Sequence, residues 1–204
     1  MKGPDEAWAI KRITRQASER IFRHAFEHAR RTGRKKVTAG HRANVLNLTD
    51  GLFLQCGRDV AAGFSGIVFD DCMVDALCLR LVKQPETINV LVLPNQYGDI
   101  LSDLCGGIAG SLGLAPGANI GEHVSFFEAS HGAAPDIAGR GVANPIALIL
   151  SGAMLLGHLG EVEAAQRVRE AVTTVLREAR YLTPDLGGRA RTADPTRAII
   201  GALR

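Results

Sequence analysis

The segment from Asn89 to Glu122 constrains the fold most, because a short apolar stretch runs directly into a helix-like stretch that carries two aspartates. Residues 90–93 are typical of a buried strand, and Asp99 and Asp103 follow with a spacing of four. Side chains at positions i and i+4 lie on one face of a helix. The segment therefore predicts a strand, a helix and a pair of carboxylates of the kind that hard divalent cations prefer.

Strand-like and helix-like stretches alternate along the rest of the chain. Strands are predicted at 36–39, 67–69, 90–93 and 126–129. Helices are predicted at 6–31, 44–62, 74–83, 99–112, 144–158 and 161–180, with a turn at 183–188 and a last short helix. The Asn144-Pro145 pair is a strong helix start. This alternation predicts an α/β fold.

Composition excludes several classes of protein. The 204 residues suffice for one good-sized core or for two small lobes that share a sheet. The net charge is only +3, and the densest basic run, at 30–36, is typical of a solvated helix end, so no nucleic-acid partner is expected. No apolar run approaches the ~20 residues that span a bilayer, and no signal-peptide core is found. We expect a cytoplasmic protein that does not contact a membrane; the alternative is a matrix-type protein whose address segment has already been removed.

The cysteines predict buried thiols rather than a metal site. None of the pairs among Cys56, Cys72, Cys78 and Cys105 has the CxxC spacing, and each lies among apolar residues. A reduced, cytosolic-type protein without structural zinc is therefore expected.

A third carboxylate, Asp75, opens a leucine-rich helical stretch and needs a partner there. A cation shared with Asp99 and Asp103 would supply one, although sequence spacing alone could not assemble the trio. The alternative is that Asp99 only caps its helix and that Asp103 is a solvated surface residue.

The loop His131 to Gly139 predicts a nucleotide contact. Its glycines and Pro135 indicate a rigid loop whose backbone approaches a ligand, and Asp136 could accept hydrogen bonds from a ribose diol. A histidine in a loop is, however, most often a local hydrogen-bonding group. The glycines at 107, 110 and 113 do not form the GxGxxG fingerprint, so no Rossmann site is predicted.

Together these motifs resemble the C-terminal part of the isocitrate and isopropylmalate dehydrogenase family, and most closely its NAD-dependent isocitrate dehydrogenase branch. The resemblance covers nearly the whole chain after Ala7. Its most specific segments are NQYGDILSD, HGAAPDIAG, HRANVLNLTDGLF, FDDCMVDALCLRLVKQP and LTPDLGG. It implies a truncated α/β sheet with flanking helices, in which residues 1–88 are the dimerisation or small-domain-like part and residues 89–204 the cofactor-loop and large-domain-like part.

The resemblance also implies the ligands. Asp99 and Asp103 would bind Mg²⁺ or Mn²⁺ together with Asp75 from the neighbouring subunit of a dimer, and the metal would hold the substrate's hydroxyl and carboxylate. NAD would bind at Asn44, His131, Gly132, Ala133, Pro135, Asp136, Ile137 and Asn144. Asp136 suits an unphosphorylated ribose, because it would repel a 2′-phosphate.

Two departures from the family pattern bear on catalysis. Arg42 stands where the family has a lysine that assists proton transfer, and arginine stays protonated at any ordinary pH, although it could still anchor a carboxylate. The family's N-terminal part, which supplies the substrate-gripping serine and arginines and a proton-donating tyrosine, has no counterpart in these segments. With Arg42 and Asp75 as the catalytic candidates, a single copy is not expected to complete the usual reaction.

Three functions therefore remain open. The first is oxidative decarboxylation of a small 2-hydroxy acid with NAD, in a homodimer or a hetero-oligomer that supplies the missing groups. The second is a metal-dependent decarboxylase or lyase with no net redox step. The third is a non-catalytic nucleotide-binding subunit.

Overall fold

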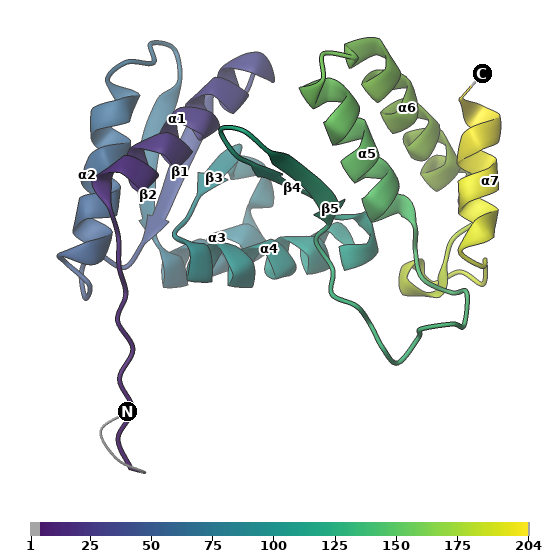
Figure 1. Ribbon diagram of the computed structural model, residues 1–204, viewed down its shortest axis with the longest axis horizontal. Coiled ribbons are helices and arrows are strands. Elements are labelled where there is room, and N and C mark those ends of the chain that lie inside the picture. Colours follow the sequence, from purple (N-terminus) through teal and green to yellow (C-terminus); the bar gives the residue numbers. More distant parts are fainter. Residues whose placement is uncertain (1–4, 204) are drawn as a thin grey trace. The chain divides into compact units, whose positions relative to one another are not determined.

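A computed structural model describes residues 5–203, and the chain divides into two compact units (Figure 1). Unit 1 is Met1–Ser102 and unit 2 is Asp103–Arg204. Each unit has its own cluster of buried apolar side chains. The predicted α/β class is confirmed, since both units combine strands with helices.

Unit 1 is built on a three-stranded parallel sheet in the order β2-β1-β3. The strands are β1 (Lys36–His41), β2 (Val68–Met73) and β3 (Val90–Val92). The central strand β1 is buried along almost its whole length, as expected for a parallel strand covered on both faces. His41 is the last residue of β1. It therefore lies on the side of the sheet formed by the carboxyl ends of the strands, where polar side chains of parallel strands converge.

The helices of unit 1 connect and cover these strands. They are α1 (Arg15–Arg31), α2 (Thr49–Ala61), α3 (Val74–Lys83) and α4 (Asn95–Ala109), of which α4 runs across the boundary between the units. Aromatic rings fill the space between α1, α2 and the sheet: Phe22 lies 4.7 Å from Phe53 and 6.0 Å from Phe69, between ring centroids. Gly57 keeps this contact close, because a Cβ there would lie 2.8 Å from the Phe22 and Phe69 rings.

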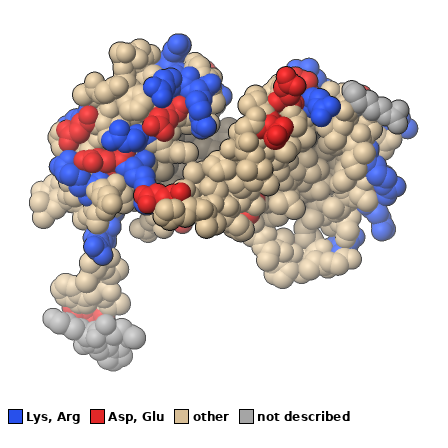
Figure 2. Space-filling view, turned by 45° about the horizontal axis from the view of Figure 1, so that its top comes forward, with Lys and Arg blue, Asp and Glu red and all other residues tan. Residues whose placement is uncertain are grey.

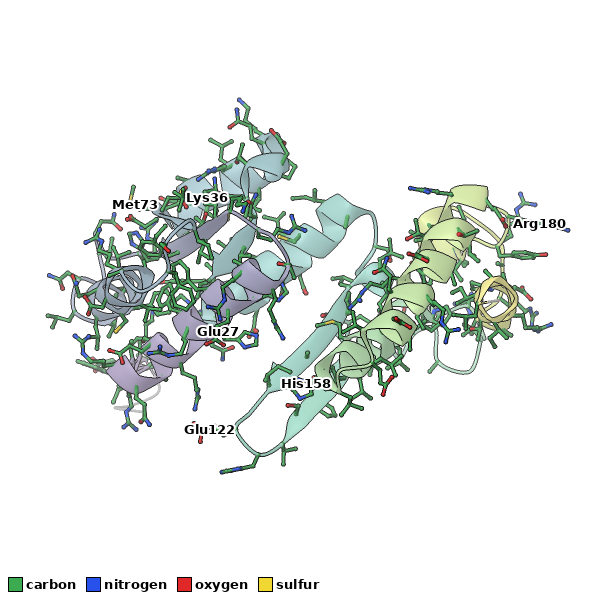
Figure 3. The ribbon with its side chains drawn as sticks, turned by 90° about the horizontal axis from the view of Figure 1, so that it is seen from above. Glu27, Lys36, Met73, Glu122, His158 and Arg180 are labelled. Atoms are coloured by element: carbon green, nitrogen blue, oxygen red, sulfur yellow. The ribbon has the colours of Figure 1, made fainter. Side chains whose placement is uncertain are left out.

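Unit 2 combines a hairpin with three helices. The antiparallel strands β4 (Pro116–Ile120) and β5 (Ser125–Ala129) pack on α5 (Ile146–His158), followed by α6 (Val162–Glu178) and α7 (Ala193–Ala202). Figure 3 shows Glu122 at the tip of the hairpin and His158 at the end of α5, where its ring lies 5.5 Å from that of Phe127. The buried Ser151 hydroxyl donates to the Glu128 carbonyl at 2.6 Å and accepts from the Gly117 N–H at 3.3 Å, which ties α5 to both strands.

Several predicted boundaries were wrong. The helix predicted at 6–31 begins only at Arg15, because Thr14 caps it by accepting the Ala17 N–H, and Ile10 in the preceding segment is 95% exposed. The helix predicted at 44–62 begins at Thr49 after a turn. Strand β4 was not predicted at all. Its sequence PGANI carries strand-disfavouring residues, and only pairing with β5 makes it a strand.

The cysteine prediction was correct only in part. All four are free thiols, but Cys56 alone is buried while Cys72, Cys78 and Cys105 are half-buried. Figure 2 shows Lys and Arg side chains mixed with Asp and Glu side chains over unit 1 on the face drawn, rather than one continuous field of a single sign.

Candidate functional site

A pocket of about 890 Å³ lies within unit 2, in the volume range that small-molecule ligands occupy. Three segments far apart in sequence form it: the turn that follows α4, the loop between β5 and α5, and the segment that precedes α7. Small side chains predominate in its lining, which comprises Ser111, Leu112, Gly113, His131, Gly132, Ala133, Ala134, Ile137, Ala138, Gly139, Gly141, Val142, Ala143, Asn144, Pro184, Asp185 and Thr192. Such a lining lets the main chain approach a flat or diol-bearing ligand closely.

A hydrogen-bond network centred on Asp185 joins the three segments. Asp185 Oδ2 accepts from Ser111 Oγ at 2.5 Å and from Asn144 Nδ2 at 3.0 Å. Ser111 Oγ accepts the Gly113 N–H at 2.9 Å, and Asn144 Oδ1 accepts the Ile146 N–H at 3.0 Å. The network fixes the Asn144 amide at the start of α5, and hence the wall of the pocket.

The ionised form of Asp185 is favoured by this network. Burial by itself would raise the pKa of the Asp185 carboxyl, but the hydrogen bonds from Ser111 and Asn144 hold it below its ordinary value. The pocket therefore contains a fixed negative charge.

The loop between β5 and α5 has an unusual backbone. Ala134 has φ 44°, a left-handed conformation that costs a non-glycine residue energy, while Gly139 and Gly141 adopt φ 75° and 64° without strain. Thr192 anchors the end of the loop: its N–H donates to the Gly141 carbonyl at 2.9 Å and its hydroxyl to the Ala143 carbonyl at 2.6 Å. The loop is thus held in shape from the segment before α7.

The pocket brings together five of the eight predicted cofactor residues: His131, Gly132, Ala133, Ile137 and Asn144. Pro135 and Asp136 belong to the same loop but do not line the pocket, and Asp136 is exposed. Asn44 lies in unit 1, exposed in the turn after β1. The predicted NAD contacts of Asp136 and Asn44 remain predictions.

Sequence reasoning missed the residues that close the pocket. Ser111, Asp185 and Thr192 come from segments whose spacing carries no cofactor signal by itself. The LTPDLGG segment that contains Asp185 was noted only as a match to the family and as a turn. Its position beside Asn144 depends on the packing of unit 2, which the sequence pattern does not reveal.

The carboxylate pair on α4 has the predicted spacing and is solvated. Asp99 and Asp103 lie one helical turn apart, and both are exposed. Because both carboxylates are solvated, the cost of burying a charge cannot argue for a cation here. Their oxygen atoms and spacing still fit a hard divalent cation that takes its other ligands from elsewhere.

Asp75 lies at the start of α3, with its side chain 62% exposed rather than enclosed by apolar neighbours. Its Oδ2 lies 2.7 Å from Arg42 Nη1 of the same chain. The Ala76 N–H and the Arg42 guanidinium lower the pKa of the Asp75 carboxyl. Among the described residues, no group of three or more His, Cys, Asp or Glu side chains is arranged to hold a metal ion.

The fold and pocket define an α/β protein with a small-molecule-sized pocket beside the start of α5, and comparison with known proteins specifies the family. A family model described as isocitrate/isopropylmalate dehydrogenase matches residues 1–201. The chain belongs to this family.

Individual relatives agree with this assignment. Catalytic subunit 5 of the mitochondrial NAD isocitrate dehydrogenase of Arabidopsis thaliana is 50% identical over 196 residues, which are 96% of this chain and 52% of the relative. The 3-isopropylmalate dehydrogenase of Archaeoglobus fulgidus is 52% identical over 199 residues, 98% of this chain and 61% of the relative. The crystal structure of isocitrate dehydrogenase from Methylococcus capsulatus matches with a TM-score of 0.94 and 49% identity, over 100% of this chain and 62% of that one.

The chain thus spans about half to three fifths of the length of these relatives. Within the part of the chain that the structure describes, no helix combines the length and apolar character needed to cross a bilayer.

Proposed function

We propose that this chain is the nucleotide- and metal-binding part of an enzyme that oxidatively decarboxylates a small 2-hydroxy acid with NAD. The observation that carries the proposal is the pocket of unit 2, whose lining includes five of the predicted cofactor residues. The Asn144 amide and the backbone of residues 131–133 would bind the adenosine end of the cofactor. Membership of the family supports the reaction class.

Mg²⁺ or Mn²⁺ would bind at Asp99 and Asp103, with Asp75 contributed by a neighbouring subunit. Both α4 carboxylates are exposed and hence accessible to such a ligand set. When bound, the metal would stabilise the negative charge that develops as the alcohol becomes a ketone and CO₂ leaves. The assembly would be a homodimer or a hetero-oligomer, in which the neighbouring subunit supplies Asp75. A cytoplasmic location remains a prediction.

One observation favours a second candidate, a non-catalytic nucleotide-binding subunit. Arg42 occupies the place of the family's lysine, and its guanidinium is paired with Asp75 at 2.7 Å. Arginine cannot exchange protons at ordinary pH, so this side chain would fix a carboxylate rather than shuttle a proton.

The nucleotide site can be tested by calorimetric titration of the full chain with AMP and NAD. A Cβ at Gly113 would lie 2.7 Å from Asn144 Cβ and 2.9 Å from Asp185 Oδ2, so Gly113→Ala should displace both groups. We expect micromolar to millimolar binding by the unaltered chain and at least about tenfold weaker binding by the variant, the equivalent of one lost hydrogen bond. Gly201→Ala is the matched control, because nothing lies within 4 Å of a Cβ there. No heat with either nucleotide would refute the site.

The reaction is tested by following NADH with Mn²⁺ and isocitrate, isopropylmalate, malate or tartrate, with and without co-purified partners. NADH formation with any of these acids supports the dehydrogenase. Release of CO₂ that needs metal but no NAD would identify a lyase instead. Nucleotide binding without either product would leave the non-catalytic subunit as the function.

A further inference from the structure

The turn that follows β1 presents two of the predicted site residues. Arg42 and Asn44 lie on either side of Ala43, directly after His41 ends the strand. The Arg42 carbonyl accepts the N–H groups of Val45 at 2.9 Å and Leu46 at 2.8 Å, which closes the turn. The two residues that precede Asn44 are Arg42 and Ala43. Their N–H groups donate to side chains rather than to backbone carbonyls.

The first side chain is Asp50, which is fully buried on α2. Its Oδ2 accepts the Arg42 N–H at 2.8 Å, and its Oδ1 is paired with the Lys11 ammonium. Burying a carboxylate without partners would cost free energy. The pairing with Lys11 offsets this cost for Asp50. The Lys11 ammonium in turn lies 4.5 Å from the centroid of the Tyr97 ring on α4.

The second side chain is His41 itself. Its Nδ1 accepts the Ala43 N–H at 3.0 Å, so Nδ1 must carry a lone pair. Its Nε2 lies 3.0 Å from Asp71 Oδ2 and therefore carries the proton that this carboxylate accepts. Asp71 is also near Arg58, with Oδ1 3.4 Å from Nη2. The contacts on the two ring nitrogens together select one tautomer of a buried imidazole.

We propose that His41 is a positioning residue, whose Nε2–H tautomer, set by Asp71, holds the Ala43 amide and thereby fixes the turn that presents Arg42 and Asn44. Asp50 holds the same turn one residue earlier. The functional part of this inference rests on the proposed function, since it is that function which gives Arg42 and Asn44 their roles. The structural part, a turn held through one ring nitrogen, stands independently of any substrate.

A histidine that only fills space would not need both nitrogens engaged. The hydrogen bonds at Nδ1 and at Nε2 can be tested separately. Asparagine places its Oδ1 near the position of histidine Nδ1, whereas glutamine places its amide nitrogen near that of Nε2. His41→Asn should keep the acceptor for Ala43 and lose the contact with Asp71. His41→Gln should do the reverse.

The test measures amide hydrogen exchange at Arg42 and Ala43 and the ¹⁵N resonances of the imidazole in the full chain. We expect the unaltered protein to show the Nε2–H tautomer. His41→Gln should speed Ala43 exchange by about tenfold, as for one lost hydrogen bond, while His41→Asn should stay within about twofold of the unaltered protein. Thr38→Val is the control, because Thr38 is fully buried on the same strand and its hydroxyl has no partner within the described part of the chain.

The effect of the His41 variants on catalysis is measured separately, as kcat. In the active assembly, His41→Gln should lower kcat while AMP affinity at the pocket of unit 2 stays unchanged, and His41→Asn should restore most of kcat. Equal exchange rates in both variants, or an Nδ1–H tautomer, would overturn the inference even if the enzyme is active. Conversely, the expected exchange pattern in a chain that binds no nucleotide would uphold the role of His41 in the turn and reject only the proposed function.

Discussion

At the scale of single residues, the proposed chemistry depends most on the guanidinium at position 42. Arg42 is paired with Asp75, and a guanidinium cannot give up a proton near neutral pH. If the assembly is a dehydrogenase limited by this group, Arg42→Lys should raise the rate of NADH formation by about 10²-fold, the usual contribution of a general acid–base group. The measurement is kcat with Mn²⁺ and the best substrate, with Arg23→Lys on the exposed surface of α1 as the control.

The charge on Asp185 makes a second prediction at this scale. Its pKa is lowered in the folded protein, so the stability it contributes is present above the ordinary carboxyl pKa and is lost as pH falls through the folded-state value. Asp185→Asn should therefore reduce the free energy of unfolding at pH 7 by about 1 kcal/mol or less, since the residue is partly solvated. The difference should shrink toward acid pH in urea titrations.

Glu178→Gln, at the end of α6, is the control for this pH series. It is expected to change stability by less than about 0.5 kcal/mol at any pH, as surface substitutions usually do. A constant difference between Asp185→Asn and the unaltered chain from pH 7 to pH 3 would show that the carboxylate is not favoured by its neighbours.

At the scale of elements, the chain shows which features a sequence can predict. The helix predicted at 74–83 has those bounds in α3, and the Asn144-Pro145 start was located within two residues of α5. Local signals, apolar periodicity and capping, suffice there. Strand β4 could not be predicted because its residues disfavour a strand and only pairing with β5 makes it one, and the contact of Asp185 with Asn144 joins residues distant in sequence. The pocket was accordingly predicted from one loop, without the segments that close it.

Helix α6 offers a prediction about how an element ends. It terminates at Ala179, whose φ of 53° is left-handed and costly for a residue with a Cβ. Ala179→Gly should stabilise unit 2 by about 0.5–1 kcal/mol. Ala164→Gly, inside the same helix, should destabilise it by about 1 kcal/mol, because glycine is a poor helix former. Thermal unfolding of the two variants checks this, and changes of the same sign would contradict the assignment of the cap.

At the scale of the whole molecule, the two units have separate cores, and the pocket belongs to only one of them. The pocket lies entirely in unit 2, and the unit has its own core around Ile146 and Val172. The sheet of unit 1 belongs to a separate core around Phe22 and Phe26. A ligand that binds only the folded form of one unit stabilises that unit by RT ln(1 + [L]/Kd), about 2.7 kcal/mol at 100 times Kd.

AMP carries only the adenosine end of the cofactor, so it should protect unit 2 alone. In hydrogen-exchange mass spectrometry of the full chain at saturating AMP, we expect slower exchange in peptides covering 111–113, 131–144 and 184–192. Peptides from β1, β2 and β3 should be unchanged, because no residue of these strands lines the pocket. Inorganic phosphate at the same concentration is the control for the anionic group. Protection that appeared first in the sheet of unit 1 would mean that the nucleotide binds elsewhere, and that the pocket around Asn144 serves another ligand.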